Sequence, residues 1–518
     1  MLLGFVVTYW IISVGIGLWA AMRVKNTGDF ALAGRSLPMA IVTATVFATW
    51  FGSETVLGIP ATFLREGIGG VIADPFGSSM CLILVGLFFA RPLYRMKLLT
   101  IGDFYRNKYG RAVEAITTIC IVISYLGWVA AQISALGLVF NVVSEGAISI
   151  SAGMIIGAST VLLYTIWGGM WSVAITDFIQ MIIIVIGMLY IGWDVSQMAG
   201  GVGTVVNHAI DAGKLSNFFP EATLAGILAF TAAAVTMMLG SIPQQDVFQR
   251  VASAKDEKTA GRASVLGGVL YFGFAFIPMF LAYSATLIDP ELVNKLIDGD
   301  KQAQLILPSM ILSHAPLVAQ ILFFGALLSA IKSCASATLL APSVTFTENI
   351  LRPAFRKMND RQLLLAMRIV VLCFTILVTI FALNSHLSIY KMVENAYKVT
   401  LVSAFVPLAF GLYWRRANTF GAMAAIFLGL STWIWMEILA PDAICPPQLA
   451  GLFAALIGMI AGSLAPMGRR HAESQSSGHH GPHATHATPA GHAGHAHEGH
   501  ATHAAQGAQI AGSEHNPR

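Results

Sequence analysis

Charged residues are scarce in this sequence. Of its 518 residues, only 11% are charged, whereas 56% are hydrophobic and the mean hydropathy is +0.71. Soluble globular domains carry roughly 25% charged residues, so this composition excludes an ordinary soluble domain. It indicates a protein that crosses a lipid bilayer several times. The formal net charge of +4 says little, because in such a protein the placement of charges matters more than their sum.

Cysteines are also few, and their spacing fits neither a metal site nor a disulfide framework. The five are Cys81, Cys120, Cys334, Cys373 and Cys445. The sequence lacks a phosphate-binding glycine loop followed by lysine, so ATP is not indicated. It also lacks a catalytic constellation and a basic, aromatic pattern suited to nucleic acid. We therefore expect a protein that is not an enzyme, has no organic cofactor and does not bind nucleic acid.

Long apolar runs are abundant instead. A helix needs about 20 apolar residues to cross a bilayer, and we predict thirteen such spans. They lie near 1–22, 38–62, 71–90, 113–142, 147–168, 171–193, 222–242, 263–288, 317–342, 363–383, 390–414, 420–439 and 447–466. The first run has no basic residue before it, unlike a secretory signal peptide, so we expect a retained helix.

Lysine and arginine fix the predicted orientation. In the segments that follow the odd-numbered spans, 22 of the 30 basic residues lie on one side of the membrane. Cytoplasmic loops carry the excess of basic residues, so this side is predicted to be cytoplasmic. We therefore expect a multi-pass protein of the plasma (inner) membrane, with its N-terminus outside and its C-terminus inside.

Two of the runs contain matching breaks. Gly52-Ser53 precedes Pro60 in the second span, and Gly240-Ser241 precedes Pro243 in the seventh. Non-helical backbone survives at membrane depth only where it lines a cavity enclosed by protein. Spans two to six and seven to eleven form two sets of five, so the second set is inverted, and each set begins with a broken span. This arrangement is expected of a secondary transporter with a midplane site between inverted repeats.

The predicted fold is therefore an all-α polytopic membrane protein with a five-plus-five core. Residues 1–37 form the first helix and a linker, 38–414 the transport core, and 415–466 two peripheral helices. Within the core, 38–193 is the first repeat and 222–414 the second. Residues 467–518 contain eleven histidines and little apolar content, so we expect a disordered cytoplasmic tail. Histidine-rich tracts can hold Zn or Ni, and we interpret such affinity as incidental.

Several motifs resemble the sodium:solute symporter family from the first span to the last. They are Leu32-Ala33-Gly34-Arg35-Ser36-Leu37-Pro38, Leu163-Tyr164-Thr165-Ile166-Trp167-Gly168-Gly169 with Thr176-Asp177-Phe178-Ile179-Gln180, and the run from Gly325 to Ser336. Within the family, Ala48-Thr49-Trp50, the run from Leu84 to Pro92, and Gly240-Ser241-Ile242-Pro243 with Phe248-Gln249-Arg250 resemble the high-affinity choline transporter branch. The resemblance implies a core like that of the neurotransmitter:sodium symporters.

The resemblance also implies one sodium ion between the first broken helix and span nine. Its ligands would be the carbonyls of Ala48, Phe51 and Ala330 and the hydroxyl of Ser333, with position 334 as the last ligand. The sequence departs from the family here, because Cys334 offers a thiol instead of a hydroxyl and Ser336 replaces an acidic residue. Asp177 would lie on the route by which the ion leaves.

Lys332 is the most unusual departure, since a lysine near the middle of a span costs about 2.5–3.5 kcal/mol unless it faces a cavity or a partner. Glu54 is equally out of place in the first broken span. We predict that they form an ion pair that lines the site, with the alternative that they face opposite vestibules. A charged Lys332 inside the cation cage would replace sodium, and transport would then be proton-coupled or uncoupled.

Trp50 and Trp128 match aromatic residues of the choline branch that hold a quaternary ammonium by cation–π attraction. Ser78 and Gln244 stand where that branch has further aromatic rings. We therefore expect Trp50, Glu54, Ser78, Trp128 and Gln244 to share one cavity for a solute smaller or more polar than choline. The predicted function is sodium-coupled symport of a small organic solute. A membrane sensor with a transporter fold is the less favoured alternative.

Overall fold

The computed structural model describes residues 2–355 and 357–465. The regular structure of this part of the chain is helical, apart from an isolated bridge between Leu37 and Ala254. The first set of helices is α1 (Leu2–Ala21), α2 (Thr27–Leu32), α3 (Met39–Trp50), η2 (Glu54–Gly58), α4 (Ile59–Glu66), η4 (Ile72–Gly77), α5 (Ser78–Leu84), η5 (Val85–Phe89), α6 (Ala90–Arg95), α7 (Ile101–Tyr109), α8 (Arg111–Val143), α9 (Ile150–Met198) and α10 (Val202–Asp211).

The second set begins with another broken helix. It comprises α11 (Leu224–Gly240), α12 (Gln245–Ser253), α13 (Glu257–Ile288), α14 (Pro290–Leu296), α15 (Ile306–His314), α16 (Leu317–Phe346), η7 (Thr347–Leu351), α17 (Arg352–Ala354), α18 (Asp360–Asn384), α19 (Ile389–Thr400), η8 (Leu401–Phe405), α20 (Val406–Tyr413), α21 (Thr419–Leu439) and α22 (Pro447–Leu464).

Ten helices in the described residues are long and apolar enough to cross a membrane, or up to twelve if each of two bent pairs is one span. The bent pairs are α3 with η2–α4, at 50°, and α11 with α12, at 46°. Both predicted breaks are therefore present. The predicted runs 147–168 and 171–193 lie in one element, α9, of 49 residues, with a non-helical residue, Gly169, between them.

A kink at Gly169 divides α9 into two helical arms at the boundary between the two predicted runs. Gly169 has φ 48° and ψ −140°, outside the helical region. A Cβ at this position would lie 2.4 Å from the carbonyl oxygen of Phe30 in α2. Only glycine combines a positive φ with such a close backbone approach, so the direction of α9 changes at this residue.

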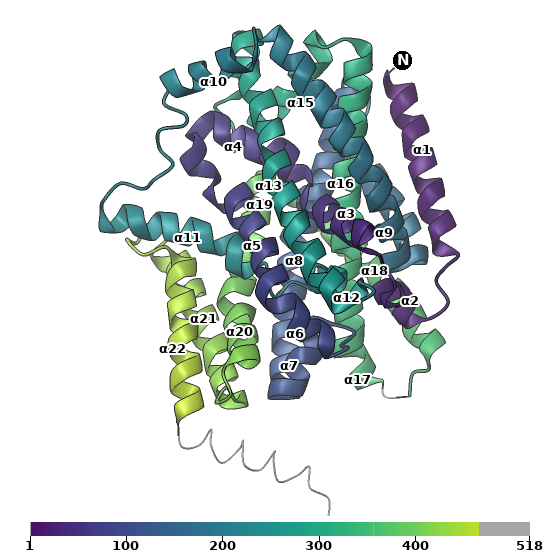
Figure 1. The fold of residues 1–518 in the computed structure, drawn as a ribbon, viewed down its shortest axis with the longest axis vertical. Helices are drawn as coiled ribbons and strands as arrows, with labels where there is room; N and C mark the ends of the chain where they lie inside the picture. The colour runs from purple at the N-terminus through teal and green to yellow at the C-terminus, as the bar shows by residue number, and fades with distance from the viewer. Residues whose placement is uncertain (1, 356, 466–518) are drawn as a thin grey trace, which may run out of the picture. The chain divides into compact units, whose positions relative to one another are not determined.

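The basic residues gather at one end of the helical bundle. Figure 1 shows α6, α7 and α17 at the end opposite to α10, α15 and the N-terminal end of α1. We call the end with α6, α7 and α17 the basic end, since Arg95, Lys108 and Arg352 lie in or beside these helices. This grouping matches the charge asymmetry read from the sequence.

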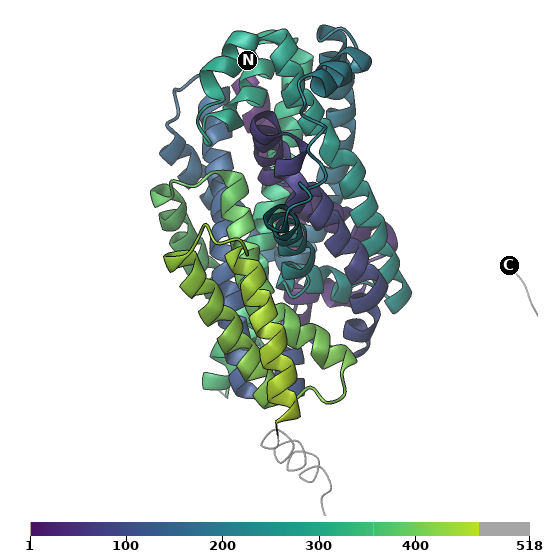
Figure 2. The same cartoon turned by 90° about the vertical axis from the view of Figure 1, so that its left-hand side faces the viewer.

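Two helices at the C-terminal side of the bundle pack closely on each other. Figure 2 shows α21 and α22 side by side. Their backbones approach through small residues, because a Cβ on Gly421 would lie 2.8 Å from the Met459 carbonyl oxygen and one on Gly458 would lie 2.7 Å from that of Ala424. Small residues allow such close approach between membrane helices.

The centre of the bundle is α16. Every residue from Ala326 to Thr345 is buried, so this stretch is enclosed by other helices on all sides. It packs against α9, α8 and α3, and its serines, cysteine and lysine therefore face protein rather than lipid. The first broken helix thus lies beside the most enclosed part of the chain.

Candidate functional site

The first break exposes a backbone carbonyl at the centre of the bundle. In a regular helix the amide of Gly52 would donate to the carbonyl of Ala48. Here it donates to the carbonyl of Trp50 instead, at 3.0 Å. Phe51 has φ −83° and ψ 72°, outside the helical region. The carbonyl of Ala48 has therefore lost its helical partner, which makes it available to a cation.

Three rings gather beside this break, and we call Trp50, Trp128 and Tyr397 the aromatic cluster. Trp50 stacks on Tyr397 with ring centroids 5.9 Å apart, and Trp128 lies 5.7 Å from Trp50 and 5.3 Å from Tyr397. The rings come from α3, α8 and α19 and all are buried. Tyr397 was not predicted, and it supplies a third aromatic ring beside the two that the sequence indicated.

Glu54 lies at the edge of the aromatic cluster. Its carboxylate accepts hydrogen bonds from the indole Nε1 of Trp128 at 3.3 Å and from Nε2 of Gln132 at 2.6 Å. Oε1 of Gln132 in turn accepts the backbone N–H of Ser53 at 3.0 Å. Trp128 and Gln132 are one turn apart on α8, so this helix holds the carboxylate of the broken helix in place.

Gln244 and Ser78 occupy different positions around the cluster. Nε2 of Gln244 lies 2.9 Å from Oγ of Ser124, one turn before Trp128, and 3.3 Å from Oγ1 of Thr400. Gln244 therefore connects the second break to α8 and α19. Ser78 donates to the sulfur of Met237 on α11 at 3.7 Å, so its hydroxyl is directed toward α11.

The predicted sodium ligands of α16 face two different helices. Ser333 donates to Oδ1 of Asp177 in α9 at 2.6 Å. Oδ2 of Asp177 is buried without a hydrogen-bond partner in the described residues. Cys334 faces the first break, because a Cβ on Gly52 would lie 2.9 Å from its sulfur and 2.7 Å from Oε2 of Glu54. Glu54 and Cys334 are thus neighbours across Gly52.

The predicted ion pair between Glu54 and Lys332 is wrong for this structure. Nζ of Lys332 donates to Oγ of Ser13 at 2.6 Å and lies 4.6 Å from the ring centroid of Trp10, both on α1. It lies 5.5 Å from the ring of Tyr164. Lys332 and Cys334 are two residues apart on a helix of 3.6 residues per turn, so they point to nearly opposite sides. The lysine faces the peripheral helix and not the aromatic cluster.

A second buried carboxylate lies nearby and was missed in the sequence. Oδ1 of Asp74 accepts a hydrogen bond from the hydroxyl of Tyr271 at 2.5 Å, and that hydroxyl lies 3.0 Å from Oγ1 of Thr55. The ring of Tyr271 lies 6.4 Å from that of Trp50. The sequence signal for this site was an aspartate inside an apolar run. Its assignment to the site depends on a contact with α13 that the sequence does not reveal.

A cavity of about 400 Å³ lies at the end of the bundle opposite to the basic end, and we call it the vestibule. Its polar lining comprises Thr62, Arg65, Glu66, Asn217, Asp300, Gln304, Lys391 and Glu394. Asp300 forms ion pairs with Arg65 of α4 and with Lys391 of α19, the latter at 2.8 Å. The segment between α14 and α15 therefore bridges two helices that lead to the aromatic cluster.

The hairpin that carries Asp300 is fastened at its base. Oδ1 of Asp289 caps α14 by accepting the N–H of Leu292 at 3.0 Å, and Oδ2 of Asp289 lies 2.8 Å from Nε2 of His314. The hydrogen bond from His314 holds the pKa of Asp289 below its ordinary value. The two ends of the α14–α15 hairpin are thus joined outside the membrane-spanning helices.

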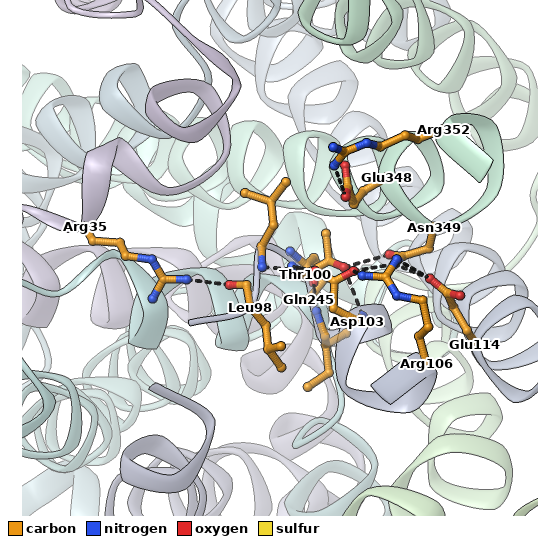
Figure 3. A network of polar contacts seen from close by, with 12 residues as sticks. Arg35, Leu98, Thr100, Asp103, Arg106, Glu114, Gln245, Glu348, Asn349 and Arg352 are labelled. Atoms are coloured by element: carbon orange, nitrogen blue, oxygen red, sulfur yellow. Dashed lines mark hydrogen bonds and ion pairs between the residues drawn. The ribbon is translucent and has the colours of Figure 1, made fainter. Parts of the chain in front are cut away.

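A polar network links the helices at the basic end, as Figure 3 shows. Asn349 of η7 donates to Asp103 at 3.1 Å and to Glu114 at 2.8 Å. Arg106 pairs with the same two carboxylates, at 2.8 and 3.2 Å. Oε1 of Gln245, at the start of α12, accepts the N–H of Ile101 at 2.8 Å. The second broken helix is therefore fixed to the helices of the basic end.

No group of three or more His, Cys, Asp or Glu side chains that could hold a metal ion is found within residues 2–355 and 357–465. The expected zinc or nickel affinity was assigned to the histidine-rich segment, which lies outside the described residues.

Comparison with known proteins adds to this geometry. A model of the sodium:solute symporter family matches residues 30–429. The high affinity choline transporter 1 of Homo sapiens is 29% identical over 440 residues, which cover 82% of this chain and 75% of that protein. The osmoregulated proline transporter OpuE of Bacillus subtilis is 27% identical over 484 residues, 89% of this chain and 93% of the relative.

The fold is also similar to a solved structure. The outward-open, substrate-bound form of a Na⁺-coupled sialic acid symporter has a TM-score of 0.75 and 19% sequence identity, over 89% of this chain and 96% of that one. At this identity the similarity concerns the fold alone.

Proposed function

This chain belongs to the sodium:solute symporter family, and from this premise we propose that it couples the inward flow of sodium to the uptake of a small organic solute. It is a multi-pass membrane protein by its apolar helices and by its transporter relatives. In this proposal it works by alternating access in the plasma membrane. The relatives include transporters of choline and of proline, and both names are consistent with a small organic solute.

The observation that carries the proposal is the break at Gly52. It leaves the Ala48 carbonyl without its helical partner. The neighbouring helix α16 carries the buried hydroxyl of Ser333. Sodium is a hard cation that prefers neutral or anionic oxygens, and broken helices supply them at the midplane of transporters. We place the sodium ion between α3 and α16, with Ala48, Phe51, Ala330 and Ser333 as ligands and Cys334 beside them. Asp177, bonded to Ser333, would receive the ion on its way inward.

We place the solute at the aromatic cluster. Trp50 and Glu54 come from the first broken helix and Trp128 from α8. A solute held there would therefore contact both the broken helix and α8. Gln244 lies at the second break and connects to the same helix as Trp128. Ser78 stays in the proposal as an outer wall, although its hydroxyl is directed to Met237.

The vestibule supports an outward-facing arrangement of these parts. It opens above the aromatic cluster, since Gly58 in its wall is one turn beyond Glu54 and Glu394 is one turn before Tyr397. The network around Asn349 ties α7, α8 and η7 together at the opposite, basic end. A solute would thus enter from the vestibule while the basic end is closed.

The alternative in which Lys332 replaces sodium is less well supported by the geometry. An ammonium that substitutes for the ion would have to point at the Ala48 carbonyl and Ser333. Lys332 instead contacts Ser13 and Trp10 of α1. Proton-coupled or uncoupled transport remains the second candidate, because this lysine is buried without a carboxylate partner in the part of the chain that the structure describes.

Uptake into proteoliposomes tests the proposal. The full chain is reconstituted, and radiolabelled amines, amino acids and carboxylates are offered with an inward sodium gradient or an equal potassium gradient. We expect uptake of one class that requires the sodium gradient and is abolished by a sodium ionophore. Uptake of equal rate in potassium would overturn sodium coupling and favour the second candidate.

A further inference from the structure

Glu54 is a buried carboxylate whose charge has no partner. The residue is only 2% exposed, and none of the ion pairs in the described residues involves it. A buried charge is normally paired, since an isolated one is strongly destabilising. The predicted partner, Lys332, points to α1 instead. No basic side chain of the described residues therefore pairs with Glu54.

The hydrogen bonds around Glu54 favour the ionised form. Oε1 of Gln132 is occupied by the N–H of Ser53, so the amide group of Gln132 must present its NH₂ to Glu54. The indole N–H of Trp128 reaches the other carboxylate oxygen. Both neighbours are donors, and an ionised carboxylate is an acceptor at both of its oxygens. The hydrogen bonds at Glu54 are thus those that an anion accepts.

The surroundings decide which cation fits this anion. Besides Cys334, the groups next to Glu54 are the N–H donors of Gln132 and Trp128. The rings of Trp50 and Tyr397 adjoin that of Trp128. Ring faces attract organic ammonium ions by cation–π interaction. The cluster of Trp50, Trp128 and Tyr397 therefore suits an organic cation better than a metal ion.

Asp74 is a second buried carboxyl group near Trp50. Its carboxylate is bonded to Tyr271, which lies against Trp50, and it too has no ion-pair partner among the described residues. Two carboxylates thus flank the aromatic cluster. Neither has an ion-pair partner in the part of the chain that the structure describes.

We propose that Glu54 binds the ammonium group of the transported solute, and that this group carries at least one N–H. The carboxylate would accept the N–H while Trp50, Trp128 and Tyr397 cover the adjoining methylene groups. A fully alkylated ammonium has no N–H to give, so it would use the rings alone. This inference specifies the substrate class of the proposed transporter and rests on that function.

Binding to the purified full chain tests it. Thermal stabilisation in detergent is measured with ethanolamine, N-methylethanolamine, proline, choline and uncharged ethylene glycol, each with and without sodium. We compare the wild type with Glu54→Gln and with the control Glu221→Gln, which removes one carboxylate from an exposed loop. A single cooperative melting transition without any added compound shows that each variant is folded.

We expect the compounds with an ammonium N–H to stabilise the wild type and Glu221→Gln. In Glu54→Gln their dissociation constants should rise about tenfold or more, because a charge-assisted hydrogen bond contributes roughly 1.5–3 kcal/mol. Choline should bind the wild type more weakly than these amines do, and Glu54→Gln should raise its dissociation constant less. Three results would overturn the inference. The amines could bind Glu54→Gln as tightly as the wild type, or ethylene glycol alone could bind. No compound could bind at all while sodium still stabilises the protein.

Two results separate this inference from the proposed function. Loss of sodium stabilisation in Glu54→Gln would make Glu54 a sodium ligand and would overturn its assignment to the solute, while sodium coupling survives. Amine binding that depends on Glu54 but not on sodium would support the inference and overturn sodium coupling.

Discussion

Cys334 is the residue at which this chain departs most from a sodium site made of hard oxygens. Its sulfur lies at the first break, beside Gly52, where the family resemblance places the last ligand of the ion. A thiol is a soft ligand, and a cation of this kind prefers oxygen. The wild-type site should therefore bind sodium weakly.

Cys334→Ser should tighten sodium binding, because it restores a hydroxyl of similar size. We expect the sodium concentration that gives half-maximal thermal stabilisation to fall by roughly tenfold, the equivalent of one hydrogen-bond-sized contribution. Cys373→Ser is the matched control, since Cys373 is exposed on α18 and should change nothing. An unchanged sodium concentration in Cys334→Ser would remove position 334 from the ligand set.

Lys332→Met tests the role of the buried lysine. Methionine keeps the length of the side chain and removes a charge that has no carboxylate partner in the described residues. We expect sodium-dependent uptake to persist. The free energy of unfolding should rise by about 1 kcal/mol or more, because the substitution removes an unpaired charge from a buried position. Melting temperature and uptake in sodium and potassium measure the two effects. Sodium-independent uptake in the wild type that becomes sodium-dependent in Lys332→Met would instead make the lysine a substitute for the ion.

The sequence identified part of the site at this scale. Trp50 and Trp128 were selected by their likeness to the choline branch, and the structure brings them together with Glu54. Tyr397 and Asp74 were not found, because they reach the cluster from helices whose rotation the sequence does not specify. The same limit explains the wrong ion pair, since hydropathy places Lys332 on an enclosed helix without saying which side it faces.

At the scale of elements, sequence reasoning found the breaks better than the helix ends. Glycine, serine and proline inside an apolar run marked both bent pairs. The same approach split α9 in two, because Gly168-Gly169 interrupts the apolar pattern. In the structure the interruption is a single non-helical residue, Gly169, which has a positive φ. Hydropathy detects that the helix is interrupted, but it does not give the number of non-helical residues in the interruption.

The hairpin between α14 and α15 is the element that closes over the vestibule. Asp300 joins it to α4 through Arg65 and to α19 through Lys391. These ion pairs are about one-third exposed on the Asp300 side, so each contributes at most roughly 1 kcal/mol. They are too weak to hold the fold and are strong enough to shift an equilibrium between open and closed vestibules.

Asp300→Asn should therefore leave the melting temperature nearly unchanged and open the vestibule. A cysteine placed at Thr62, in the cavity wall, should react severalfold faster with a membrane-impermeant maleimide in this variant, as a shift of roughly 1 kcal/mol implies. Asp298→Asn is the matched control, since Asp298 lies in the same segment without an ion pair in the described residues. Equal labelling rates in both variants would show that the ion pairs do not hold the hairpin.

For the whole molecule, the open question is the number of membrane crossings. A straight helix of 49 residues would be about 74 Å long, more than twice the roughly 30 Å of a hydrocarbon core, and α9 has that many residues. We propose that its two arms, on either side of Gly169, cross separately. Together with the ten long helices and two bent pairs, this would make thirteen spans, an odd number.

Contacts at the vestibule support this count. Lys214, in the segment between α9 and α11, donates to the carbonyl of Leu64 beside α4 at 2.7 Å. The chain thus has the ends of α4 and α9 on one side of the membrane. Two crossings by α9 return the chain to the side on which α9 starts, so that Lys214 can reach α4. A single crossing would put Lys214 on the side opposite to the start of α9.

A reporter inserted after Gly213 should therefore be extracytoplasmic, and one fused after Arg470 should be cytoplasmic. Alkaline phosphatase is active only outside and a green fluorescent protein fluoresces only inside, so each position is tested twice with opposite expected signals. The positive-inside rule gives the same answer, because the basic end carries α6, α7 and α17 and cytoplasmic segments are enriched in lysine and arginine. Reporters on the same side at both positions would leave an even number of crossings between them. That result would remove one of the seven spans expected after Gly213 and contradict the odd count of thirteen.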